Sequence, residues 1–119
     1  MFVIFSANVS DTQVLKDLEG LYAPIKQVQV CRGAYEGVEE QAFVVHANYD
    51  ALPALHEMVL GEYEQPALLV VDYNKNCVMY TVGKGVAAIP CGTWRKVSQA
   101  YALKCDAYTR IAQDYFVVE

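Results

Sequence analysis

Two segments with helical spacing interrupt a series of short apolar runs, and this alternation constrains the fold of the 119-residue chain more than any other feature. The runs FVIFSANV (2–9), IKQVQV (25–30), QAFVVHA (41–47) and ALLVVDY (67–73) are rich in β-branched and aromatic residues, as strands are. The segments 10–20 and 50–66 carry apolar residues at helical intervals. The order β-α-β-β-α-β predicts an α+β, ferredoxin-like fold: a split β-α-β antiparallel sheet of four strands with two helices on one face.

Local signals mark the ends of both helices. Ser10 is a candidate N-cap with Gln13 in the capping-box position, and Gly20 marks the end of the first helix. Asp50 is the candidate cap of the second helix, which Pro66 closes.

The remaining chain is predicted to add to this core. NKN (74–76) is a turn before a hairpin strand, CVMYTV (77–82), while GVAAI (85–89) and the terminal YFVVE are further strand candidates. We expect a single domain, 1–119, with a core of about 1–90 and a C-terminal extension of about 91–119. A four-stranded sheet with one bare face favours a homo-oligomer with pockets where subunits meet.

Composition excludes several classes of function. The net charge is −5 and the nine Lys and Arg residues are scattered, so we expect no nucleic-acid partner. No apolar run approaches the roughly 18 residues of a membrane span, and the N-terminal run has no basic flank, so we expect a cytoplasmic protein without a membrane partner.

The four cysteines, at positions 31, 77, 91 and 105, form no C-x-x-C pair, and no histidine stands at zinc-finger spacing from them. We expect no metal site. These cysteines could function as a disulfide pair or as a redox-active thiol. The structural alternative is that they are reduced, buried thiols.

Three glutamates, Glu36, Glu39 and Glu40, crowd against the start of the apolar run 41–47. They are either solvated residues that flank an apolar strand or ligands of a cation. Strand alternation sends Phe43 to the face under the helices and Glu40 to the opposite face, where a small residue, Ala42, leaves room for a ligand or a second subunit.

The stretches YEGVEEQAFVV (35–45), EYEQPALLVVDY (62–73) and YTVGKG (80–85), with GLY (20–22) before them, resemble in order and context the phage-encoded S-adenosylmethionine lyases, formerly described as hydrolases. The resemblance covers roughly residues 18–97. It implies a ferredoxin-like homotrimer with active sites at subunit interfaces. It also implies cleavage of S-adenosylmethionine to 5′-methylthioadenosine and homoserine lactone without a metal or cofactor.

The family's essential glutamate falls on Glu40, with Glu39 as second choice, and its active-site tyrosine falls on Tyr35. We therefore expect Glu40 and Tyr35 to be catalytic, and Glu39, Phe43, Val44 and His46 to contact substrate. His46 shares the parity of Glu40, although a strand histidine bonded to backbone is the structural alternative. Lactone formation needs no general base, because the substrate's own carboxylate attacks.

Other features have structural alternatives. The loop GKG (83–85) lacks the P-loop pattern and is predicted to be a turn, and Glu62 and Glu64 at the end of the second helix are surface charges or ligands. The aromatic residues of the tail are predicted to be core or subunit interface: Trp94, Tyr101, Tyr108, Tyr115 and Phe116.

The resemblance places the enzyme in the host cytoplasm, where depletion of a methyl donor would counter restriction. Two other classes of function remain open: a non-catalytic trimeric ligand-binding or regulatory module, and an acidic anti-defence interaction protein.

Overall fold

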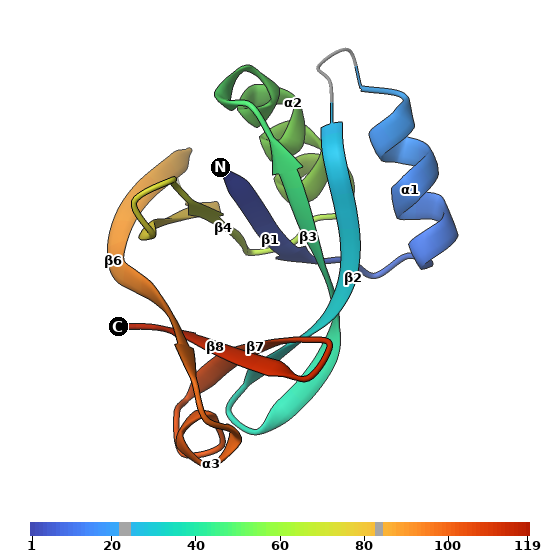
Figure 1. The fold of residues 1–119 in the computed structure, drawn as a ribbon. Coiled ribbons are helices and arrows are strands. Elements are labelled where there is room, and N and C mark those ends of the chain that lie inside the picture. Colours follow the sequence, from blue (N-terminus) through green and yellow to red (C-terminus); the bar gives the residue numbers. More distant parts are fainter. Residues whose placement is uncertain (22–24, 83–84) are drawn as a thin grey trace.

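The computed structural model describes residues 1–21, 25–82 and 85–119, and within them eight antiparallel strands form one closed barrel (Figure 1). The strands are β1 (Phe2–Ser6), β2 (Ile25–Tyr35), β3 (Val38–Ala47), β4 (Ala67–Val71), β5 (Asn76–Val82), β6 (Val86–Val97), β7 (Ala107–Ile111) and β8 (Asp114–Val118). Around the barrel they follow the order β1-β3-β2-β7-β8-β6-β5-β4, and β4 pairs again with β1.

The predicted ferredoxin-like fold is wrong because the sheet does not stop at four strands. β4, β1, β3 and β2 do lie side by side, but β5 and β6 continue from β4, and the hairpin β7–β8 joins β2 to β6. The two strands that would be free edges of a ferredoxin-like sheet are thus both paired, and closure satisfies the hydrogen-bonding groups that an edge exposes. Residues 91–119, predicted to be an extension, supply the strands that close the barrel.

Helical segments cover one side of the barrel (Figure 1). They are α1 (Asp11–Glu19) and a continuous second segment made of a 3₁₀ turn η1 (Tyr49–Ala51), α2 (Leu52–His56) and a π-helix η2 (Glu57–Glu62). A short helix, α3 (Gln99–Ala102), precedes β7.

The predicted ends of α1 are confirmed, because the Ser10 side chain accepts a hydrogen bond from the Gln13 backbone N–H and Gly20 is the C-cap. The predicted cap at Asp50 is wrong, because the helical segment begins earlier and Asp50 lies inside the 3₁₀ turn that Asn48 precedes.

The two faces of β3 belong to two separate cores. Phe43 and Val45 are fully buried in the cluster between the sheet and the helices, together with Val14 of α1 and Leu55 of α2, as strand alternation predicts. Ala42 and Val44, which have the opposite parity, lie inside the barrel. They belong to a second cluster with Ile4, Cys31, Leu69, Val71, Cys77 and Trp94. The second face of the sheet is therefore not bare, and the argument from a bare face to an oligomer does not hold.

The C-terminal residue forms the seam where β8 meets β6. Glu119 exchanges two backbone hydrogen bonds with Thr93, at N–O distances of 2.7 and 2.9 Å. The neighbouring Gly92 has φ +128°, and a Cβ placed on it would lie 2.6 Å from the carbonyl carbon of Glu119. Only glycine fits this close backbone approach.

Among the residues that the structure describes, no helix is long and apolar enough to cross a membrane. The predicted turn at GKG and the GLY stretch of the resemblance fall in part on residues 22–24 and 83–84, which lie outside the described residues.

Candidate functional site

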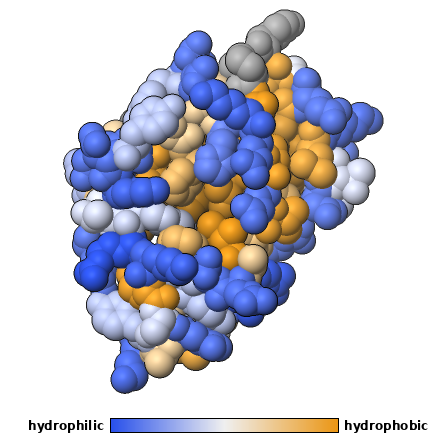
Figure 2. Space-filling view, viewed as in Figure 1, coloured by the Kyte–Doolittle hydropathy of each residue, from blue (hydrophilic) through white to orange (hydrophobic). Residues whose placement is uncertain are grey.

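One end of the barrel holds a cavity of about 610 Å³. It lies where the ends of β1, β2 and β8 meet the beginnings of β3, β4 and β7 in the antiparallel register, so residues distant in sequence line it together: Ser6, Tyr35, Glu40, Ala67, Ala107 and Val118. The volume is in the range of small-molecule sites, roughly 300–1,000 Å³. Apolar residues also gather near the centre of the molecular face in Figure 2, framed by hydrophilic ones.

Glu40, the predicted catalytic glutamate, lies at this end of the barrel and lines the cavity. Its Oε1 accepts a hydrogen bond of 3.0 Å from the Ser6 hydroxyl of β1. Its cross-strand partner on β2 is Gly33, which has no side chain to fill the space beside it. The glutamate is solvent-exposed, so its carboxylate needs no buried counter-charge and is available to a ligand that enters the cavity.

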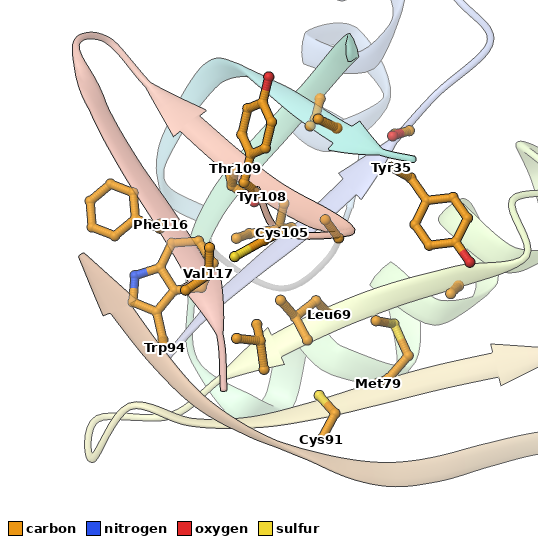
Figure 3. A pocket seen from close by; sticks show the side chains of 18 of the residues that line it. Tyr35, Leu69, Met79, Cys91, Trp94, Cys105, Tyr108, Thr109, Phe116 and Val117 are labelled. Carbon is orange, nitrogen blue, oxygen red and sulfur yellow. The ribbon is translucent and has the colours of Figure 1, made fainter. Parts of the chain in front are cut away.

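Tyr35, the predicted catalytic tyrosine, ends β2 and also lines the cavity, with 67% of its surface exposed. Figure 3 shows its ring on the side of the cavity opposite Trp94 and Phe116. The turn that follows contains Glu36 at φ 51° and Gly37 at φ 83°. The Glu36 N–H donates a 2.7 Å hydrogen bond to the carbonyl of Asp106, which anchors this turn to the segment before β7.

Glu39 lies on the outer face of the barrel, although it is adjacent to Glu40 in the sequence. Its carboxylate lies 3.7 Å from Nε of Arg32 and 3.6 Å from Nη2 of Arg110, and it accepts a hydrogen bond from the Tyr108 hydroxyl. That hydrogen bond raises the pKa of Tyr108 to about 12. Two guanidinium groups already balance the charge of Glu39. In the arrangement observed, Glu39 therefore takes part in structural ion pairs.

The other three predicted substrate contacts do not line the cavity. Phe43 is on the helix side of the sheet, where its ring stacks on Phe5 at 5.6 Å. Val44 is buried in the barrel core. His46 is near the opposite end of β3, with its ring 5.3 Å from that of Phe2, and its pKa is lowered mainly by burial. Strand alternation correctly predicts that His46 and Glu40 share a face of β3. It does not bring them together, because they lie near opposite ends of the strand.

Several cavity residues were missed by sequence reasoning, and most come from the C-terminal third. Trp94 of β6 stacks on Phe116 of β8 at 5.0 Å and meets Phe2 edge-on at 5.4 Å, so it forms an apolar wall that is only 7% exposed (Figure 3). Met79 and Cys91 contribute further apolar surface. The density of aromatic residues in the tail is the sequence signal of this wall, although by itself it predicts only a core or a subunit interface.

The ionisable lining of the cavity is acidic. Glu40, Asp106 and Glu119 line it, whereas no Lys or Arg does so among the residues that the structure describes. Glu119 is paired with Arg95 at 2.7 Å and accepts a hydrogen bond from Tyr101, which leaves Glu40 and Asp106 as the carboxylates without an ion pair in the described part of the chain. Such a lining favours a cationic ligand over an anionic one.

The two buried cysteines offer no nucleophile. All four are free, and burial raises the pKa of the Cys31 and Cys77 thiols to about 11, so both are protonated at neutral pH. Within residues 1–21, 25–82 and 85–119, no group of three or more His, Cys, Asp or Glu side chains is arranged to hold a metal ion.

Comparison with known proteins assigns the chain to a family. The model of the S-adenosylmethionine lyase family matches residues 5–119, nearly the whole chain, and the protein therefore belongs to that family. The match extends through the C-terminal strands that the resemblance in the sequence left out. A search of curated proteins gave no match.

Proposed function

Starting from this membership, we propose that the protein cleaves S-adenosyl-L-methionine to 5′-methylthioadenosine and L-homoserine lactone, with the barrel cavity as the substrate site. The observation that carries the proposal is the placement of the Glu40 carboxylate in a largely apolar cavity whose ionisable lining is acidic. The substrate brings two positive charges, a sulfonium and an ammonium group, to such a site.

The reaction proceeds within the substrate. One carboxylate oxygen attacks the γ-carbon and forms the lactone C–O bond. The bond between that carbon and sulfur breaks, and its electron pair stays on sulfur as a neutral thioether. No water, proton acceptor or external nucleophile is consumed, so the demand on the protein is to hold carboxylate and sulfonium in a near-attack geometry.

Glu40 is the group that holds this geometry. Its carboxylate binds the ammonium group of the substrate and thereby orients the methionyl arm, and it takes no part as a nucleophile. The absence of Lys and Arg from the described lining residues leaves the substrate carboxylate without a competing ion pair. Opposite charges are consumed in the transition state, which an apolar wall such as Trp94 favours over water.

Tyr35 is the second substrate contact in this proposal. Its exposed ring at the edge of the cavity is placed to stack on the substrate or to offer its face to the sulfonium. Glu39, Phe43, Val44 and His46 do not line the cavity, so they have no direct part in the proposed substrate site.

The biological setting follows from the same premise. We propose that the enzyme works in the cytoplasm of a host cell as a homotrimer, without a cofactor, and that it lowers the supply of methyl donor to restriction enzymes during phage infection. The family resemblance supports this setting.

Glu40→Gln tests the proposal. Gln keeps the shape of the side chain but loses the charge that binds ammonium, so we expect kcat/KM for S-adenosylmethionine to fall at least about 100-fold, which corresponds to about 2.7 kcal/mol. The measurement is mass spectrometry of products over time. Glu57→Gln is the matched control, because Glu57 is an exposed glutamate of the π-helix outside the cavity, and it should retain the wild-type rate.

The products discriminate between the possible functions. Homoserine without a transient lactone would indicate a hydrolase. Binding of S-adenosylmethionine without any product would indicate a ligand-binding module, and no binding at all would favour an interaction protein. An unchanged rate in Glu40→Gln would contradict the proposed role of Glu40 in binding the ammonium group.

A further inference from the structure

The hydroxyl of Ser6 makes the hydrogen bond that Glu40 accepts within the described part of the chain. Ser6 is the last residue of β1, and its Oγ lies 3.0 Å from Oε1 of Glu40, although 34 residues separate the two in the sequence. The contact exists because β1 and β3 are neighbours in the barrel, with Ser6 directly opposite Ala42. Neither residue type nor spacing indicates this pair in the sequence.

We propose that Ser6 is the positioning residue of the active site, which holds the Glu40 carboxylate in the orientation that binds the substrate's ammonium group. The inference rests on the proposed function and adds a residue to it. In this role Ser6 contacts Glu40, and it affects substrate binding only by orienting the Glu40 carboxylate.

Among the described neighbours of Glu40, Ser6 is the residue that can orient its carboxylate. On the β2 side its cross-strand partner is Gly33, and even a Cβ added there would meet only the Ala42 Cβ, at 3.5 Å. Glu40 is also exposed, so burial in the core does not fix its three side-chain torsions. A glutamate gains up to about 2 kcal/mol of free energy from such rotamer freedom when nothing holds it. The hydroxyl on the β1 side selects among these rotamers before substrate arrives.

The hydrogen bond uses one carboxylate oxygen and leaves the other for the ligand. Oε1 accepts from Ser6, while Oε2 has no hydrogen-bond partner among the described residues. A carboxylate fixed at one oxygen and open at the other can accept a further charge-assisted hydrogen bond from an ammonium group.

Ser6→Ala tests the inference. The variant keeps Glu40 but frees its carboxylate, so we expect KM to rise and kcat/KM to fall about 10- to 30-fold, the lower part of the range for a hydrogen bond to a charged group, because the pair is exposed to solvent. Ser6→Thr keeps a hydroxyl on a strand position that accepts β-branched residues, and it should recover most of the activity.

A double-mutant cycle separates positioning from a merely structural role. If Ser6 acts through the Glu40 carboxylate, adding Ser6→Ala to Glu40→Gln should cause no further loss of kcat/KM beyond that of Glu40→Gln. An equal loss in both backgrounds would overturn the proposal, as would a Ser6→Ala enzyme with unchanged KM and kcat/KM.

Ser10→Ala is the matched control for stability. Ser10 caps α1 outside the cavity, so its loss should lower the melting temperature and leave KM unchanged. A wild-type enzyme that forms no methylthioadenosine would overturn the proposed function and, with it, the role of Ser6. Turnover by the wild type with no coupling between Ser6 and Glu40 would overturn the positioning role alone.

Discussion

His56 of α2 is a partly buried titratable group outside the site. Its ring lies 4.4 Å from that of Tyr80, and its Nε2 is buried with no hydrogen-bond partner within the described residues. Burial lowers the pKa of His56 below its ordinary value of 6.5. His56 is in this way part of the packing between α2 and β5.

The stability of the protein should therefore depend on pH below neutrality. The unfolded state takes up a proton at His56 as the pH falls through 6.5, while the folded state does not, so stability falls with falling pH until the lowered pKa is reached. The slope should stay below the about 1.4 kcal/mol per pH unit of one full proton.

His56→Phe keeps a ring against Tyr80 and removes the proton site. Urea denaturation between pH 5.5 and 7.5 should show a shallower loss of stability in the variant, with a residual slope to which His46 contributes, since its pKa is lowered as well. Equal slopes in the two proteins would contradict the burial of neutral His56.

At the scale of elements, a side-chain hydrogen bond links α1 to the end of the second helical segment. Tyr63 follows the π-helix directly and is 4% exposed, and its hydroxyl donates a hydrogen bond of 2.6 Å to Asp17 of α1. Burial and this bond raise the pKa of Tyr63 above its usual range. The adjoining Glu62 and Glu64 are exposed. The stretch EYEQ thus contains a structural tyrosine between two surface glutamates.

Removing that hydroxyl should loosen the packing of α1. Tyr63→Phe leaves one oxygen of the half-buried Asp17 carboxylate unpaired, and we expect the free energy of unfolding to fall by about 1–2 kcal/mol. Tyr73→Phe is the matched control, because the Tyr73 side chain is 73% exposed, and it should change stability by less than about 0.5 kcal/mol. Thermal denaturation followed by circular dichroism measures both. Equal melting temperatures for the two variants would refute the link.

At the scale of the whole molecule, closure of the barrel depends on the seam between β6 and β8. The cavity wall crosses this seam, since Trp94 and Phe116 come from its two strands. Opening the seam would expose the barrel core and the cavity, so we expect stability and the proposed activity to be coupled there.

Gly92→Ala should open this seam. The added Cβ meets the Glu119 backbone at 2.6 Å and forces alanine to φ +128°, so we expect a loss of about 2–4 kcal/mol in the free energy of unfolding. Gly61→Ala is the control, because a Cβ there meets nothing within 4 Å and the residue is helical, so stability should stay within about 1 kcal/mol of wild type. Trp94 fluorescence in urea reports on both. A Gly92→Ala protein as stable as Gly61→Ala would show that the seam is not rigid.

The sequence by itself determined the local features. The Ser10 cap, the Gly20 end, the burial of Phe43 and Val45 under the helices and the inward face of Glu40 all follow from spacing within one segment, because side-chain direction repeats with the period of a helix or strand. The four stretches at 20–22, 35–45, 62–73 and 80–85, taken in order, also indicated the family.

Only the tertiary structure decided what depends on which strands become neighbours. Closure of the barrel, the aromatic wall of Trp94 and Phe116, the different partners of Glu39 and Glu40, and the bond from Ser6 to Glu40 join segments far apart in the chain. Backbone pairing is nearly independent of residue type, so a sequence read segment by segment shows that a strand exists but not which edge it will join. For this reason the sequence indicated a terminal strand and the aromatic residues of the tail, but not the place of the tail beside the cavity.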